Sequence, residues 1–248
     1  MANRPKAEVK PADPRGKIVD ALMELAGEQR FEDISIRDIC RKAHVSLADF
    51  RDAFPSKGAV LAGFSRRIDR AVLSQDSEEL ADESPRERLF DILMRRLEAM
   101  TSYREGLRET TAYLRREPAA ALAMNQVVLG SMRFMLEAAG IEVEGGAAGA
   151  IKLQGLALAW ARILGVWLDD DDPGLSKTMA ELDRELTRGE RAVAGVDRMN
   201  ELASPFRAIV RAAFDARRRM RERPRRGRRD GETRGADEAG EGGDATVL

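Results

Sequence analysis

SIRDICRKAHVSLADFRDAFPSK, residues 35–57, decides the fold, because this short stretch carries the signals for two helices and the start of a third. Ser35 and Asp38 have the spacing of a capping box, in which a serine and an acidic residue cap one helix start reciprocally. Ser46 and Asp49 repeat the same spacing further along. Two capping boxes so close together predict two short consecutive helices.

The turn between these predicted helices consists of only His44, Val45 and Ser46. Such a short connection between capped helices predicts a helix-turn-helix, and the alternative is an ordinary helical hairpin inside an all-α protein. Both helices carry apolar side chains for mutual packing, namely Ile36, Ile39, Cys40, Ala43, Val45, Leu47, Phe50 and Phe54.

The composition favours an all-α fold. Of the 248 residues, 43% are hydrophobic, which excludes global disorder, while only 5% are aromatic. Val, Ile and Thr do not gather in the alternating runs that half-buried strands require. The length permits one large domain or two modest ones with a substantial core.

Helix-start signals and polar stretches divide the first part of the chain. Residues 1–12 are predicted to form a flexible arm. The segment 13–75 is predicted to hold four helices, and it opens with Asp13 as a cap and Pro14 at the first helical position. The polar stretch 74–84 then marks a domain boundary.

A larger helical domain is predicted over residues 84–216. Its helices are expected at about 85–100, 103–116, 118–139, 147–169 and 174–195, with a last helix starting at Ser204. Residues 217–248 contain an Arg-rich run followed by a Gly-rich acidic segment, and we expect this tail to be disordered.

Cysteine usage and the lack of an export signal predict a cytoplasmic protein. Cys40 lies on the apolar face of its predicted helix, as a buried and reduced thiol would. The N-terminal segment lacks the apolar core of a signal peptide, and the longest apolar run, 155–168, is interrupted by Arg162. We therefore expect a soluble protein without membrane insertion.

The sequence does not favour an enzyme or a metal site. His44 is the only histidine, so no Ser/His or Cys/His pair with a supporting acid lies outside the helix-turn-helix. The acidic run 169–172 lacks the alternating spacing of a calcium loop and is interpreted as a solvated loop, in which Asp172 caps a helix. We expect no catalytic residue, no metal and no cofactor.

The N-terminal part of the chain resembles the tetracycline-repressor (TetR) family of bacterial transcriptional regulators. The resemblance rests on the first-helix pattern 18–26, on the apolar positions of the helix-turn-helix, and especially on Phe50, Phe54, Pro55, Ser56, Lys57 and Leu61. It implies an all-α protein with an N-terminal helix-turn-helix domain, followed by a larger helical ligand-binding and dimerisation domain.

The resemblance also implies a homodimer on palindromic double-stranded operator DNA, with the second helix of each motif in the major groove. Residues 46–53 would then face DNA, and Lys57 would lie beside the phosphate backbone at the next helix start. The residues expected at this interface are Arg37, Lys42, Ser46, Leu47, Ala48, Asp49, Arg51 and Lys57.

Several positions depart from the family pattern. Asp49 stands where a small hydroxyl residue is common, and Arg51 stands where a phosphate-contacting tyrosine is common. Ala53 replaces a frequent His or Tyr, while His44 replaces the usual turn glycine. Nine basic and nine acidic residues between positions 13 and 66 cancel, so a strongly basic footprint is missing.

In the second domain the resemblance implies a pocket for a small apolar effector. The candidate pocket residues are Met100, Met132, Met135, Trp160 and Trp167, for which ordinary core packing is the alternative. The Ala-, Gly- and Leu-rich segment 147–168 and the segment 175–196 are expected to form the dimer interface as an intermolecular four-helix bundle. The alternative is a central helix of a monomer.

Two functional hypotheses follow. The leading one is a TetR-like homodimeric repressor that a small apolar effector releases from its operator. The alternative is a lipid-binding accessory protein of the same fold, related to ubiquinone biosynthesis, that does not bind DNA. The acidic second helix of the motif and the segment WLDDDDPGLSKTMAELDRE, residues 167–185, resemble that protein.

Overall fold

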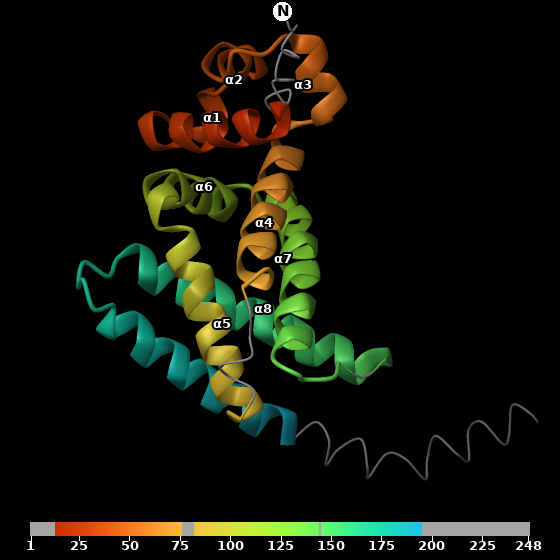
Figure 1. Ribbon diagram of the computed structural model, residues 1–248, viewed down its shortest axis with the longest axis vertical. Coiled ribbons are helices and arrows are strands. Elements are labelled where there is room, and N and C mark those ends of the chain that lie inside the picture. Colours follow the sequence, from red (N-terminus) through yellow and green to blue (C-terminus); the bar gives the residue numbers. More distant parts are fainter. Residues whose placement is uncertain (1–12, 76–81, 144, 195–248) are drawn as a thin grey trace, which may run out of the picture. The chain divides into compact units, whose positions relative to one another are not determined.

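The computed structural model describes residues 13–75, 82–143 and 145–194, and every regular element in these ranges is helical (Figure 1). The all-α prediction is therefore confirmed for this part of the chain. The predicted N-terminal arm, the helix expected from Ser204 and the Arg-rich tail lie outside the described residues.

The helix-turn-helix unit consists of α1 (Pro14–Glu28), the 3₁₀ turn η1 (Phe31–Asp33), α2 (Ile36–Ala43) and α3 (Leu47–Ala53). As predicted, Asp13 caps α1, and its Oδ1 accepts a hydrogen bond from the Arg15 N–H at 3.0 Å. α1 packs against both α2 and α3. It does so with an apolar face that includes Ile18 and Leu22, both fully buried.

The helix α4 (Lys57–Leu73) carries the chain out of the helix-turn-helix unit, and it packs against α1, α5 and α7 (Figure 1). Ser56 caps it, because the Ser56 Oγ accepts a hydrogen bond from the Ala59 N–H at 3.2 Å. Its inward face is formed by five buried apolar residues, namely Val60, Leu61, Phe64, Ile68 and Val72.

The helices of the second part begin within two residues of their predicted starts. They are α5 (Pro85–Ala99), α6 (Arg104–Arg116), α7 (Pro118–Ala138), α8 (Gly146–Leu168) and a helix over 176–194, with the short 3₁₀ turn η3 (Thr101–Tyr103) before α6. A capping box begins α5, since the side chains of Ser84 and Glu87 each accept a hydrogen bond from the other's backbone N–H.

A close crossing of α1 and α6 joins the helix-turn-helix unit to the second part. A Cβ added to Gly106 would lie only 2.2 Å from the carbonyl oxygen of Met23, so only glycine permits this approach. The described residues of both parts fall within one compact unit. The predicted boundary between 13–75 and 84–216 stays a prediction.

α7 and α8 are long and apolar enough to cross a membrane by length and composition alone. Core helices of soluble proteins meet the same criterion. α7 buries Met132 and Met135, and α8 buries Trp160 and Trp167, so each helix contributes directly to the core.

Candidate nucleic-acid interface

Two capping boxes hold the helix-turn-helix, as the sequence predicts. In α2 the Asp38 N–H donates to the Ser35 Oγ at 3.1 Å, and the Ser35 N–H donates to the Asp38 carboxylate at 3.0 Å. In α3 the corresponding bonds between Ser46 and Asp49 are both 3.0 Å. Each box satisfies donors at a helix start that would otherwise lack partners.

The capping serines also determine the charge state of the two acidic residues. The hydroxyl of Ser46 holds the pKa of Asp49 below its usual value, and the Ser35 hydroxyl does the same for Asp38. Asp49 therefore stays ionised at neutral pH. Its negative charge faces the positive end of the α3 dipole, which offsets part of its repulsion of phosphate.

The turn between α2 and α3 depends on one left-handed residue. His44 has φ of 54° and ψ of 45°, at the position where the family usually has glycine. The Val45 N–H then donates to the Cys40 carbonyl oxygen at 3.0 Å. Cys40 is buried, as expected, and this burial raises the pKa of its thiol.

α3 presents most of the predicted recognition residues to solvent. Ser46, Leu47, Ala48, Asp49 and Arg51 are exposed, with Leu47 at 51%. The expectation that the whole range 46–53 faces DNA is wrong at two positions. Phe50 is 2% exposed and Ala53 is 7% exposed, because both lie on the α3 face that packs on α1 and α2.

Arg37, Lys42 and Arg51, three cations expected at the DNA interface, fall into two groups. Arg37 and Arg51 are exposed and form no ion pair with any described residue. Lys42 is also exposed, but its Nζ pairs with Glu28 at 2.9 Å and with Glu24 at 3.3 Å, both on α1. Arg37 and Arg51 are therefore the cations of this set that are available to a phosphate.

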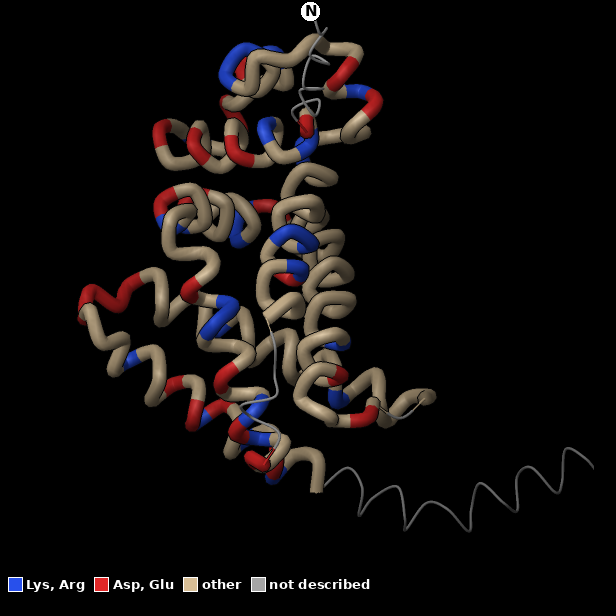
Figure 2. The backbone as a smooth tube through the Cα atoms, viewed as in Figure 1, with Lys and Arg blue, Asp and Glu red and all other residues tan. Residues whose placement is uncertain are grey.

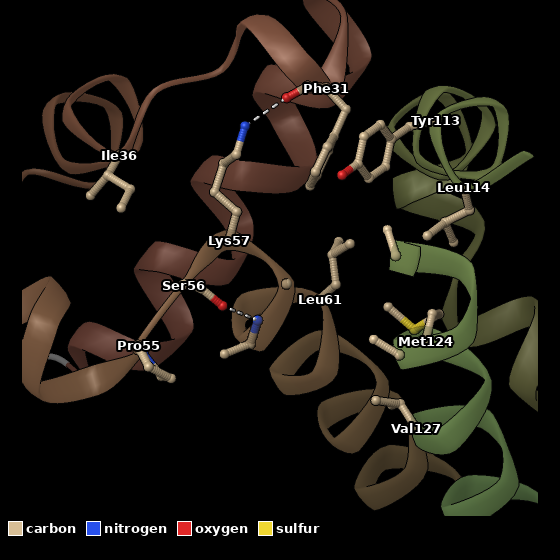
Figure 3. Close-up of a pocket in the computed structure, with 14 residues that line it drawn as sticks. Phe31, Ile36, Pro55, Ser56, Lys57, Leu61, Tyr113, Leu114, Met124 and Val127 are labelled. Carbon is tan, nitrogen blue, oxygen red and sulfur yellow. Dashed lines mark hydrogen bonds between the residues drawn. The ribbon is translucent and has the colours of Figure 1, made fainter. Parts of the chain in front are cut away.

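Lys57 is engaged inside the helix-turn-helix unit. Its Nζ donates to the carbonyl oxygens of Phe31 at 2.9 Å and Ile34 at 2.6 Å (Figure 3). The ammonium also lies 4.9 Å from the centroid of the Phe31 ring. Partial burial lowers the pKa of Lys57. This placement ties the start of α4 to η1, so the ammonium already has acceptors within the protein, and its predicted place beside a phosphate stays a prediction.

Acidic and basic residues are interleaved along α2 and α3, and no continuous basic stripe runs along either helix (Figure 2). This agrees with the equal numbers of both charges in the sequence of the unit. Affinity for DNA would therefore depend on a few local cations, since the unit as a whole carries no net positive field.

The helix-turn-helix unit is also held by contacts that the sequence did not reveal. Arg15 on α1 donates to the Ala53 carbonyl oxygen at 2.6 Å and lies over the Phe54 ring at 5.1 Å. Arg116 at the end of α6 bonds the Glu32 carboxylate at 3.0 Å. Each pair joins segments far apart in the sequence, so no local pattern points to either contact.

A cavity of about 580 Å³ lies where the helix-turn-helix unit meets α6 and α7 (Figure 3). Ile36 and the start of α4 line it from one side, Met124 is among the residues on the other, and the Phe31 and Tyr113 rings lie against each other in its wall. No local pattern in the sequence predicts this cavity, because its walls come from segments that are distant in the chain.

The five predicted pocket residues all lie in the core. Met100, Met132, Met135, Trp160 and Trp167 are at most 4% exposed, and none of them lines the cavity at the junction. The guanidinium of Arg96 lies 5.1 Å from the centroid of the Trp160 ring, and that of Arg104 lies 5.0 Å from that of Trp167. Their role in effector binding stays a prediction.

A buried polar cluster, also missed from the sequence, links α4, α5 and α7. Arg96 on α5 forms an ion pair with Asp69 on α4, and it donates to the Ser65 Oγ at 3.3 Å. The Ser131 hydroxyl on α7 donates to Asp69 at 2.7 Å. Burial lowers the pKa of Arg96, while the neighbouring Asp69 acts in the opposite direction.

The acidic loop after α8 caps the helix over 176–194. The expectation of a solvated loop is wrong at Asp170, which is fully buried and accepts hydrogen bonds from the N–H and the hydroxyl of Thr178, at 2.9 and 2.7 Å. Asp172 accepts from the Ser176 N–H at 3.2 Å, in line with the predicted capping role. These carboxylates thus serve the helix start.

Comparison with solved structures identifies the fold. The chain is similar to a TetR transcriptional regulator from Nitrosomonas europaea, with a TM-score of 0.58 and 23% identity, over 71% of this chain and 97% of that chain. A TetR regulator from a Rhodococcus species gives 0.49 and 19%, over 71% and 95%. A TetR-family regulator from Streptomyces coelicolor gives 0.47 and 15%, over 82% and 99%.

Neither a protein-family model nor a curated protein matches the sequence. The fold class is nevertheless clear from the structure, because the helix-turn-helix and the following helices match a solved TetR regulator over nearly its whole length. The chain has the fold of the TetR-family transcriptional regulators.

Proposed function

We propose that the protein is a TetR-like transcriptional repressor, which binds palindromic operator DNA as a homodimer in the cytoplasm and is released by a small apolar effector. The observation that carries this proposal is the exposed outer face of α3, held by two capping boxes in a fold shared with a known regulator. A helix presented in this way is the element that enters the major groove in helix-turn-helix proteins.

The exposed residues divide by the chemistry that each offers. Ser46 and Leu47 are proposed to reach base edges, where a leucine contacts a thymine methyl group and a serine hydroxyl bonds to an acceptor or a donor. Ala48 and Asp49 lie on the same outer face. Arg37 and Arg51 are proposed to contact phosphates and to set the register of the protein on the duplex.

Capture of genomic fragments by the purified full-length protein, followed by salt titration, tests the proposal. We expect enriched fragments that share a palindrome and whose affinity falls as salt rises, because phosphate binding releases counterions. Failure to enrich any fragment at low salt would refute DNA binding.

Substitutions on the captured fragment separate the two kinds of contact. Arg51→Ala is expected to weaken binding to all sequences and to lower the slope of log affinity against log salt by about 1. Ala48→Ser is expected to change which sequence is preferred. Arg133→Ala, an exposed cation on α7, is the matched control and should leave both properties unchanged. A uniform effect of all three substitutions contradicts this division of roles.

The proposed dimer is supported by apolar side chains left exposed on α8 and the following helix. Ile151 is 60% exposed, Leu158 is 50% exposed and Met179 is 39% exposed. Burial of such residues against a second copy would remove apolar surface from water. Sedimentation at several concentrations tests this, and Leu158→Glu is expected to shift the protein toward the monomer.

A second candidate function uses the same observation. Exposed apolar residues on α7, with Leu122 at 67% and Phe134 at 59%, together with Leu158 on α8, also fit a protein that binds lipid without binding DNA. Extraction of the purified protein with organic solvent tests this candidate. A co-purified lipid, together with no captured DNA fragment, would favour it over the repressor.

A further inference from the structure

The cavity at the junction lies between two parts of the molecule that a regulator must couple. Ile36, the first residue of α2, lines one side and is 37% exposed. Ala123 and Val127 on α7 line the other side. A molecule in this cavity would contact the helix-turn-helix unit and the second part at the same time (Figure 3).

The lining is predominantly apolar. Leu61, Leu114 and Met124 contribute aliphatic side chains, and Phe31 and Tyr113 form an aromatic wall with ring centroids 4.6 Å apart. Figure 3 shows the Tyr113 hydroxyl directed toward Leu61, which also lines the cavity. The volume of about 580 Å³ falls within the range of small-molecule sites.

The charges around the cavity restrict the occupant. Lys57 is the one charged side chain among the described residues that line it. Its ammonium already bonds the carbonyl oxygens of Phe31 and Ile34, with that of Glu32 at 3.5 Å, so its three donors have acceptors. An anion would have to displace these bonds, and a cation would find no carboxylate in the described lining. The site therefore favours an uncharged molecule.

We propose that this cavity binds a neutral, largely apolar small molecule, which uses the Tyr113 hydroxyl as its polar contact and sets the position of the helix-turn-helix unit against α7. The regulatory part of this inference rests on the proposed function, whereas the binding part does not. A ligand that fits only one spacing of α2 and α7 binds more tightly to the protein in that spacing than in any other. Such a difference in affinity is what coupling between ligand binding and DNA binding requires.

The test uses N-phenyl-1-naphthylamine, a neutral aromatic probe whose fluorescence rises in apolar sites, and the full-length protein. We expect saturable binding to the unaltered protein. Ala123→Trp and Val127→Phe, which enlarge side chains in the cavity wall, are expected to weaken it by at least about tenfold, since they fill the space that the probe needs. Circular dichroism establishes that each variant is folded.

Ala119→Trp is the matched control, because Ala119 is an exposed alanine of α7 that does not line the cavity. It should leave probe affinity unchanged. The inference is overturned if the probe fails to bind, if both filling variants keep the original affinity, or if Ala119→Trp weakens binding equally.

A second measurement separates this inference from the proposed function. Where a genomic fragment is captured, addition of the probe is expected to change the affinity of the unaltered protein for that DNA at least threefold. The DNA affinity of Ala123→Trp should not change. Equal effects on both proteins would overturn the regulatory part. A third outcome is that the filling variants alone lose probe binding while no genomic fragment is captured. That outcome would support the site and refute the proposed function.

Discussion

The helix-turn-helix and the buried cluster around Arg96 are held by opposite kinds of contact. In the first, the decisive hydrogen bonds join residues three positions apart, Ser35 with Asp38 and Ser46 with Asp49, and all four groups are near solvent. In the second, Arg96 pairs with Asp69 from another helix, and both are buried. Local contacts can be found from sequence spacing, whereas contacts between distant segments cannot.

The two regions also differ in what a broken contact costs. A lost cap leaves a helix-end N–H that water can still reach, so the penalty is small. A lost partner inside the cluster leaves a charge that water cannot solvate, so the penalty is large. Three sets of substitutions test this difference, in order of decreasing effect.

The largest effect is expected for Asp69→Ala. Removal of this carboxylate leaves the Arg96 guanidinium buried without its ion pair, and the free energy of unfolding is expected to fall by about 3–5 kcal/mol. Urea denaturation of the full-length protein measures the change.

The exposed pair of Arg86 and Asp183 provides the control, because their side chains are 30% and 60% exposed. Asp183→Ala should cost at most about 1 kcal/mol. The double variant Asp69→Leu with Arg96→Met should regain most of the lost stability, since neither charge then remains unpaired. Equal costs for Asp69→Ala and Asp183→Ala would show that burial does not separate the two regions.

An intermediate effect is expected for Gly106→Ala at the crossing of α1 and α6. The new Cβ would lie 2.2 Å from the Met23 carbonyl oxygen, and this backbone atom can move only with its helix. A cost of about 1–3 kcal/mol is expected, as for other overpacked sites. Thermal and urea unfolding measure it.

Gly130→Ala on α7 is the matched control, because nothing lies within 4 Å of the position of its Cβ. Alanine there should raise stability by about 0.5–1 kcal/mol, since glycine is a poor helix former. Destabilisation by both substitutions would show that the close crossing is not the cause at Gly106.

The smallest effect is expected for Ser46→Ala, at about 1 kcal/mol near neutral pH, from loss of the α3 cap. Part of this difference depends on pH, because the folded state lowers the pKa of Asp49 through the Ser46 hydroxyl. A lowered pKa adds stability above the pKa of the unfolded chain, and this stability is lost as pH falls through the folded value.

The stability difference between the unaltered protein and Ser46→Ala should therefore shrink under acid conditions, below the ordinary pKa of aspartate. Urea unfolding at several pH values measures this difference. Ser35→Ala, at the matching cap of α2, should behave in the same way because Asp38 has the same partners. A difference that grows on acidification would contradict the role assigned to the ionised carboxylates.

Much of the fold could be predicted from the sequence, because helix starts carry local signals. The caps at Asp13, Ser35, Ser46, Ser56 and Ser84 are all present. The exceptions within α3 were Phe50 and Ala53. The range 46–53 was expected to face DNA, and packing against α1 and α2 buries these two side chains.

The candidate site was less predictable. Sequence spacing placed Ser46 to Asp49 on the exposed start of α3, but it did not show that Lys42 and Lys57 are engaged elsewhere. The acceptors of Lys57 are carbonyl groups of η1, which every residue type has, so no pattern of side chains identifies them. The same holds for the cavity, whose walls come from four helices and a turn.

The sequence by itself determined the two capped helices and the tight turn at His44, because each depends on residues no more than a few positions apart. Only the tertiary structure decided which cations remain available to DNA, which polar groups are buried together, and where a cavity forms. These properties depend on which distant segments come into contact, and packing of the whole chain determines that choice.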